Sequence, residues 1–304
     1  MTPTVIVDFD DPRRGPDALA LARSLGAVTG ARFVTVTSYQ RDRYGMLPVN
    51  GWHSSAPAQT QAAADLARSL TAEDRGAITR VVGATSPARA LHETAEREQA
   101  DLIVISSEGG TEPGQTGAGA RGRQVLQGAP CAVAAAPAGF AETDGDLAPI
   151  GAAFDGSLES RLALASAAGL ADSMGGELRA ISVLEPPDTT HPGLAFVSYP
   201  EHLDRLSDEC RSRLLDAIDA LPVKPDSEAL VIDGEPHEAL AEHSRALGLL
   251  VVGSRGYGPL RRVLLGSVSE ALLDRAHCPL MIVPRSVDRP YGATILHARP
   301  ARSH

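Results

Sequence analysis

Residues 249 to 285 read LLVVGSRGYGPLRRVLLGSVSEALLDRAHCPLMIVPR, and this stretch decides the fold that the sequence predicts. It opens on the short apolar run Leu249–Val252, whose length and β-branched residues favour a buried parallel strand. A glycine-rich loop follows, then a predicted helix from Ser267 and a second apolar strand after Cys278. A strand, a loop, a helix and a strand in this order are typical of α/β proteins.

The glycines of this loop indicate an anion site. Gly253, Gly256 and Gly266 have the spacing G-x2-G-x9-G, and Ser267 follows the last of them. Glycine lets backbone N–H groups approach a phosphate closely, and a helix starting at Ser267 would point free amides and its positive end to the same place. The loop is not a Walker A loop because no lysine follows Gly266, and Gly256-Tyr-Gly258 does not open a first βαβ helix as a dinucleotide fingerprint would.

Working outward, the chain contains an internal repeat of about half its length. Phe9-Asp10 recurs as Phe154-Asp155, RFVTV at 32–36 as RAISV at 179–183, and Ala129-Pro-Cys131 as Ala276-His-Cys278. The order is the same in both halves, which predicts domains over 1–140 and 147–286 and a disordered tail over 287–304. Strands alternate with helices such as those predicted at 158–174 and 200–220. The fold class is therefore α/β, with two tandem, open, parallel-sheet, Rossmann-like domains.

Composition excludes several classes of protein. The 304 residues carry a net charge of −10, which disfavours nucleic acid and acidic membrane surfaces as partners. No apolar run approaches the roughly 20 residues that span a bilayer and no leader precedes the first strand, so a cytoplasmic location is expected. The three cysteines form no CxxC pair, and no disulfide framework or metal site is predicted.

The G-x2-G-x9-G-S spacing, followed by a Cys-Pro-hydrophobic strand, resembles the nucleotide loop of the universal stress protein family. The resemblance covers nearly the whole chain to about Pro284. It implies an adenine nucleotide α-hydrolase-like fold, tandem domains that pair through their last strands, and a stress-response regulator or sensor that binds ATP, with Mg²⁺ held mainly by the phosphates. It leaves open whether the chain pairs only its own domains or also forms a homodimer, and it does not name a protein partner.

Carried onto this sequence, the family's pattern assigns roles to residues of the second half. Asp155 is expected to accept hydrogen bonds from ribose hydroxyls or to lie against the adenosine, and Val183 is expected to meet adenine through its backbone. The rest of the implied ATP site comprises Val252, Gly253, Gly256, Gly266, Ser267, Val268 and Ser269.

The first half departs from this pattern. With Cys131 aligned to Cys278, two of the motif positions are lost, while Asp10 and Val36 remain; the loop positions are occupied by Ser106, Gly109, Gly119 and Ala120. We expect this half to bind nucleotide weakly or not at all and to serve in pairing and support. Arg121 and Arg123 are the residues there that could still attract phosphate.

Simpler structural interpretations stand beside these roles. Ser267-Val-Ser-Glu270 has the form of a capping box, so Ser267 could only hold the start of a helix. Asp155 could be a turn or N-cap residue of the helix after it.

Two other functions are open alternatives. One is an interaction module that dimerises and binds protein partners without nucleotide. The other is a phosphatase-type enzyme using Asp8 and Asp10 as nucleophile and general acid. The second is disfavoured because Pro12 stands where that motif requires Thr or Val, and because Ala153 replaces Asp8 in the repeat. No catalytic residue is assigned, and without a general base or a P-loop lysine any ATP hydrolysis is expected to be slow.

Overall fold

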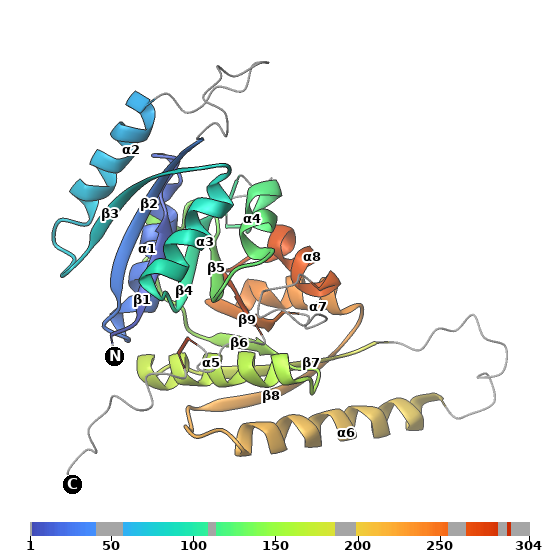
Figure 1. Ribbon diagram of the computed structural model, residues 1–304. Helices are drawn as coiled ribbons and strands as arrows, with labels where there is room; N and C mark the ends of the chain where they lie inside the picture. The colour runs from blue at the N-terminus through green and yellow to red at the C-terminus, as the bar shows by residue number, and fades with distance from the viewer. Residues whose placement is uncertain are drawn as a thin grey trace, which may run out of the picture.

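The structure is a computed structural model that describes residues 2–40, 57–108, 114–185, 199–254, 266–284 and 291–292. Within these ranges the chain forms one ten-stranded sheet with helices on both faces (Figure 1). The first half contributes β1 (Thr4–Asp8), α1 (Gly15–Ala27), β2 (Arg32–Gln40), α2 (Pro57–Leu70), β3 (Ile78–Ala84), α3 (Pro87–Glu98), β4 (Leu102–Ser106), α4 (Gly119–Leu126), β5 (Ala132–Ala136) and the 3₁₀ turn η1 (Phe140–Glu142).

The second half repeats this order. It contributes β6 (Ile150–Ala153), α5 (Leu158–Met174), β7 (Leu178–Leu184), α6 (Tyr199–Asp219), β8 (Ser227–Asp233), α7 (Pro236–His243), η3 (Ser244–Ala246), β9 (Leu249–Gly253), α8 (Ser267–Arg275) and β10 (Leu280–Val283). The α/β fold class predicted from the repeat is confirmed. Helix α5 has the predicted bounds because Ser157 caps its start, accepting a hydrogen bond from the Ser160 amide, and Gly175 ends it in a left-handed conformation.

Strand order places the two halves symmetrically. The order is β3-β2-β1-β4-β5-β10-β9-β6-β7-β8, so each half has the same arrangement and the halves meet at β5 and β10. These two strands are antiparallel, with Leu280 opposite Ala135, while every other pairing among the described strands is parallel. The two domains therefore pair through their last strands, as the resemblance implies.

Each face of the sheet has its own hydrophobic core, because successive side chains of a strand point to opposite faces. In β1, Val5 and Val7 pack on one side and Ile6 on the other. Helices α1, α2, α5 and α6 cover the first face, and α3, α4, α7 and α8 cover the second. The carboxyl ends of the strands remain as the edge where loops and helix starts meet.

A loop of the first domain also caps a helix of the second. The Thr116 amide and hydroxyl donate to the Ala276 carbonyl over 2.8 and 3.0 Å, and the Ala118 amide donates to the Leu273 carbonyl over 3.1 Å. The last carbonyls of a helix have no partners within it, so these bonds satisfy groups that α8 leaves open. The degenerate loop of the first domain thus has a structural task at the interface.

Residues near the C-terminus join the two domains a second time. Tyr291 is 1% exposed, and its hydroxyl contacts the Leu25 carbonyl and the Thr29 hydroxyl at 3.2 Å each. Gly292 lies against α5, since a Cβ there would be 2.5 Å from the Ser166 carbonyl oxygen. The disorder predicted for 287–304 therefore does not hold for Tyr291 and Gly292; the rest of that range lies outside the described residues.

Candidate functional site

The carboxyl edge of the second domain's sheet gathers most of the predicted site. Strands β9, β6 and β7 are neighbours, and Gly253, Asp155 and Val183 lie at or just beyond their carboxyl ends. Val183 and Val268 are partly buried against the same core that contains Val252. The fold thus brings β6, β7, β9 and the start of α8 to one place, where parallel sheets bind ligands.

Asp155 occupies the turn between β6 and α5. Its carboxylate is exposed and accepts a hydrogen bond of 2.9 Å from the Ser157 amide, so it forms the turn that precedes the helix. Partial burial would raise the pKa of Asp155, but hydrogen bonds from Ser157 and Ser160 outweigh it and lower the pKa. The Asp155 carboxylate is therefore an ionised hydrogen-bond acceptor at neutral pH. The structure shows its role in the turn, and this role is compatible with binding a ligand.

Gly253 has a packing reason to be glycine. A Cβ at this position would lie 2.6 Å from the backbone carbonyl carbon of Glu159 and 2.8 Å from its oxygen. The first turn of α5 therefore requires glycine at the end of β9, whether or not a ligand binds. Gly256, the next glycine of the motif, lies outside the described residues.

The start of α8 differs from the expected capping box. Gly266 is the N-cap, and its N–H donates to the Ser269 hydroxyl over 3.0 Å. Ser269 is buried and its hydroxyl in turn donates to the Gly266 carbonyl over 3.1 Å. The proposal that Ser267 holds the helix start is therefore wrong, because Ser267 is the first helical residue and is exposed. The Ser269 hydroxyl, not that of Ser267, is committed to the cap.

The first domain's counterpart of Val183 is not Val36. The Phe9 amide donates to the Val36 carbonyl, and the Phe154 amide donates to the Ile181 carbonyl, so Val36 corresponds to Ile181. Two residues further along each strand, Ser38 corresponds to Val183. Aligning RFVTV with RAISV therefore matches residues that are two positions out of register in the structure. Val36 is 1% exposed and belongs to the core.

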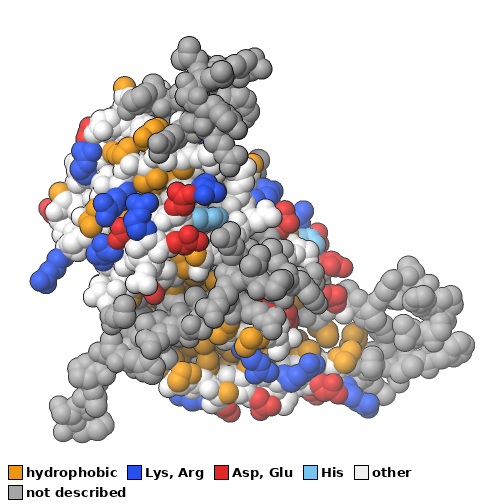
Figure 2. Space-filling view, viewed as in Figure 1, with side chains coloured by type: hydrophobic (Ala, Val, Ile, Leu, Met, Phe, Trp, Pro, Cys, Tyr) orange, Lys and Arg blue, Asp and Glu red, His pale blue; other side chains and the backbone are white. Residues whose placement is uncertain are grey.

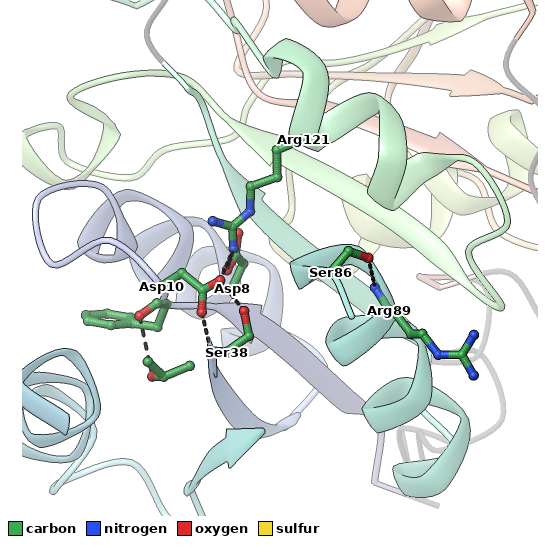
Figure 3. Close-up of polar contacts among 8 residues, drawn as sticks. Asp8, Asp10, Ser38, Ser86, Arg89 and Arg121 are labelled. Atoms are coloured by element: carbon green, nitrogen blue, oxygen red, sulfur yellow. Dashed lines mark hydrogen bonds and ion pairs between the residues drawn. The ribbon is translucent and has the colours of Figure 1, made fainter. Parts of the chain in front are cut away.

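Ser38 belongs to a buried polar cluster that fills the first domain's counterpart site (Figure 3). Asp10 accepts hydrogen bonds from the Ser38 amide and, over 2.5 Å, from its hydroxyl. Arg121 extends from α4 and donates to Asp8 over 2.5 Å and to Asp10 over 2.6 Å. Sequence reasoning assigned Asp10 to this site but missed Ser38 and the pairing of Arg121 with two carboxylates. The sequence did contain a signal for this pairing, because the first half has the charged residues Asp8 and Arg121 where the second half has Ala153 and Val268.

Electrostatics bind this cluster together. Burial raises the pKa of Asp8 to about 7, against the opposing effect of Arg121 and with a further increase from Asp10. Burial alone would lower the pKa of Arg121, but the charges of Asp8 and Asp10 raise it above its ordinary value. The guanidinium therefore stays charged and holds both carboxyl groups.

These contacts change three expectations for the first domain. Arg121 is committed to Asp8 and Asp10, and Arg123 forms ion pairs with Glu270 and Asp274 of α8, so the described contacts of both arginines are with carboxylates. A buried Asp8 bound to a guanidinium is not placed as a phosphatase nucleophile. Gly119 has a packing reason to be glycine, whether or not a ligand binds, because a Cβ there would meet the Glu108 carboxylate. Gly109 lies outside the described residues.

Away from this edge, the described residues line a further cavity of about 440 Å³ beside α3 and α4, whose lining includes Ser86, Arg89 and His92. Acidic and basic side chains intermingle on the face seen in Figure 2. Among the residues placed by the structure, no three His, Cys, Asp or Glu side chains form a metal-binding group. In the same part of the chain, no helix has the length and apolar character to cross a membrane. Burial raises the pKa of Cys278 to about 12, so this thiol is a core residue.

Comparisons with known proteins agree with this architecture. The model of the Universal stress protein family matches residues 1–137 and 148–284. Universal stress protein YxiE of Bacillus subtilis is 33% identical over 140 residues, which cover 43% of this chain and 95% of the relative. Universal stress protein Rv2005c of Mycobacterium tuberculosis is 32% identical over 190 residues, which cover 62% of this chain and 63% of the relative.

A solved structure supports the likeness of fold across both halves. The crystal structure of a universal stress protein from Archaeoglobus fulgidus matches with a TM-score of 0.63 and 18% sequence identity, and covers 94% of this chain and 99% of that chain.

Proposed function

Because the chain belongs to the universal stress protein family, we propose that this stress-response protein binds ATP in its second domain and acts as a regulator or sensor. The first domain serves as its pairing partner. The ligand site comprises the carboxyl ends of β6, β7 and β9 together with the start of α8.

The observation that carries this proposal is the state of the α8 N-terminus. The first N–H groups of a helix have no partners within the helix. Here the Ser269 side chain satisfies the N–H of Gly266. Within the described part of the chain, the amides of Ser267 and Val268 and the exposed Ser267 hydroxyl have no acceptor and remain as donors. Donors at the positive end of a helix suit a phosphate group.

The other residues fit the nucleoside part of the ligand. Asp155 is exposed and ionised, which suits it to accept hydrogen bonds from ribose hydroxyls. Val183 and Val268 leave part of their apolar surface uncovered beside buried Val252, which suits an adenine ring. ATP would supply its own Mg²⁺, coordinated mainly by phosphate oxygens.

The lowered pKa of Asp155 also bears on whether this residue could act as a general base in ATP hydrolysis. A carboxylate of low pKa is a weak base and an effective acceptor. The arrangement therefore supports binding rather than proton removal from water, and the proposed role is that of a sensor.

Calorimetry with ATP on the nucleotide-stripped chain tests this proposal through one matched pair of variants. Ser267→Glu places a negative charge where the phosphates are expected, yet an acidic residue in the first turn is compatible with the helix dipole. Ala120→Glu makes the same change at the counterpart position of the first domain. The wild type and Ala120→Glu are expected to bind one ATP per chain, and Ser267→Glu is expected to bind at least tenfold more weakly.

The assignment of the ATP site to the second domain would be contradicted if both variants lost ATP affinity equally. It would also be contradicted if the wild type bound ATP and neither variant changed its affinity. No binding by the wild type would favour the interaction module that works through protein partners alone.

A further inference from the structure

We infer that the first domain's nucleotide site is closed by its own Arg121 side chain, which occupies the position of a ligand and can be removed to open a second site. This inference rests on the proposed function of the second domain. It assigns the loss of binding to two side chains, Asp8 and Arg121, rather than to the altered glycine loop.

The first step is positional. Asp10 is the counterpart of Asp155, because Phe9 and Phe154 before them make the same hydrogen bond to the neighbouring strand. The carboxylate that is expected to bind ribose in the second domain is therefore already bound in the first domain. Its two oxygens accept from Ser38 and Arg121.

The second step compares the side chains around this carboxylate. Just after β4, the Ser107 amide donates to the Ala136 carbonyl, and just after β9 the Ser254 amide donates to the Val283 carbonyl. Ser107 therefore corresponds to Ser254, and equivalent residues in this part of the two domains are 147 positions apart. Arg121 then corresponds to Val268, and Asp8 corresponds to Ala153. Where the second domain has two small apolar side chains with uncovered surface, the first has a guanidinium paired with a buried carboxyl group.

The third step concerns charge and access. Asp8 is 5% exposed, and the Arg121 side chain is 25% exposed. Arg121 is thus more exposed to solvent than the carboxyl groups that it holds. The Nε of Arg121 is buried without a partner among the described residues, so the guanidinium is held by its contacts with Asp8 and Asp10. A nucleotide entering here would have to displace a charge-assisted contact with two carboxylates.

The test exchanges the two side chains for those of the second domain. The variant Asp8→Ala with Arg121→Val, termed the opened variant, retains Asp10 and the whole loop of the first domain. Arg123→Val is the matched control, since Arg123 belongs to the same helix but contacts Asp274 and Glu270 instead. ATP stoichiometry is measured by calorimetry after nucleotide removal, and far-ultraviolet circular dichroism checks the fold of each variant.

The inference predicts one ATP per chain for the wild type and for Arg123→Val, and two for the opened variant. In the Ser267→Glu background, the opened variant is expected to bind one. A folded opened variant that still binds one ATP would overturn the inference and leave the proposed function intact, because the barrier would then lie in the loop.

Failure of the proposed function has a different signature. If the wild type binds no ATP and the opened variant binds one, the inference stands and the proposed function fails. If neither binds, both are overturned. Should the opened variant not fold, Arg121→Ser tests the same point, since it removes the guanidinium. Asp8 can then take up a proton, because burial raises its pKa and Arg121 no longer lowers it.

Discussion

At the scale of single residues, Asp8 is an ionisable group that the fold removes from water. Its carboxyl group is buried in contact with Arg121 and feels the charges of Asp10 and Glu108. Burying a charge is costly unless it is paired, and here one guanidinium serves two carboxyl groups. The result is a carboxyl group that takes up a proton near neutral pH.

This raised pKa predicts a pH-dependent stability. Asp8 has a pKa of about 7 in the folded chain and 3.8 as its ordinary value, so between these values the folded state binds more protons. The contribution of Asp8 is therefore complete below pH 4 and is lost as the pH rises toward 7. Asp8→Asn cannot titrate, and urea unfolding from pH 4.5 to 8 compares the two proteins. The unfolding free energy of the wild type should fall relative to Asp8→Asn up to about pH 7 and then level off. A constant difference would contradict this account.

Gly253 carries a prediction that concerns packing alone. Gly253→Ala would place a methyl group against the Glu159 backbone in the first turn of α5. Because a backbone cannot move aside cheaply, we expect a loss of about 1 to 3 kcal/mol in the free energy of unfolding without any ligand. Ser106 already carries a side chain at the counterpart position, so Ser106→Ala is the control and should change stability by less than about 0.5 kcal/mol. Equal effects of the two changes would refute the packing explanation.

At the scale of elements, the start of α8 contains a serine with a structural role and a serine that is proposed to bind the ligand. Ser269 caps the helix from a buried position, whereas Ser267 is exposed at the first helical residue. Ser269→Ala should lower the free energy of unfolding by about 1 kcal/mol. Ser267→Ala should leave stability nearly unchanged and weaken ATP binding. Denaturant unfolding and calorimetry on both variants check this, and the reverse pattern would exchange the two roles.

The elements also define what the sequence could predict. Apolar periodicity was sufficient for α5, and the repeat was sufficient for the α/β fold class of each half. Register was harder to predict. The similarity of RFVTV to RAISV aligns the second strands two residues out of register. The bonds from the Phe9 amide to Val36 and from the Phe154 amide to Ile181 show that Val36 corresponds to Ile181, and hence Ser38 to Val183. Local similarity could not reveal this, because register depends on the neighbouring strand.

The same limit explains the site in the first domain. Arg121 lies more than a hundred residues from Asp8 and Asp10 in the sequence, and only the meeting of α4 with β1 brings them together. The sequence identified a degraded loop, but a charged side chain that fills the site is a tertiary contact. The glycine motif, in contrast, is local, and its end at Gly266 lies at the start of a helix as predicted.

At the scale of the whole molecule, the two domains are joined at several places distant in the sequence. Strands β5 and β10 continue the sheet across the boundary, and Thr116 and Ala118 cap α8. Tyr291 adds a contact on the opposite face, where its hydroxyl bonds to α1 and the following Gly292 lies against α5. The tandem therefore behaves as one sheet with a shared core.

Tyr291 provides a direct test of this coupling. Tyr291→Ala should lower the free energy of unfolding by about 3 to 5 kcal/mol, as expected for a buried aromatic residue, and should increase hydrogen exchange in both α1 and α5. Tyr291→Phe keeps the ring and should cost only about 1 kcal/mol for its hydroxyl contacts. If Tyr291→Ala unfolds like the wild type, or if exchange rises in one domain alone, the segment does not join the domains.

The central claim is that ATP binds to the second domain at the carboxyl edge of its sheet, and amide hydrogen exchange with and without ATP tests it most directly. The account predicts slower exchange in peptides that cover the ends of β6, β7 and β9 and the start of α8, with no change in those that contain Asp10, Ser38 and Arg121. Protection centred on the first domain, or the same exchange in both samples at saturating ATP, would contradict it.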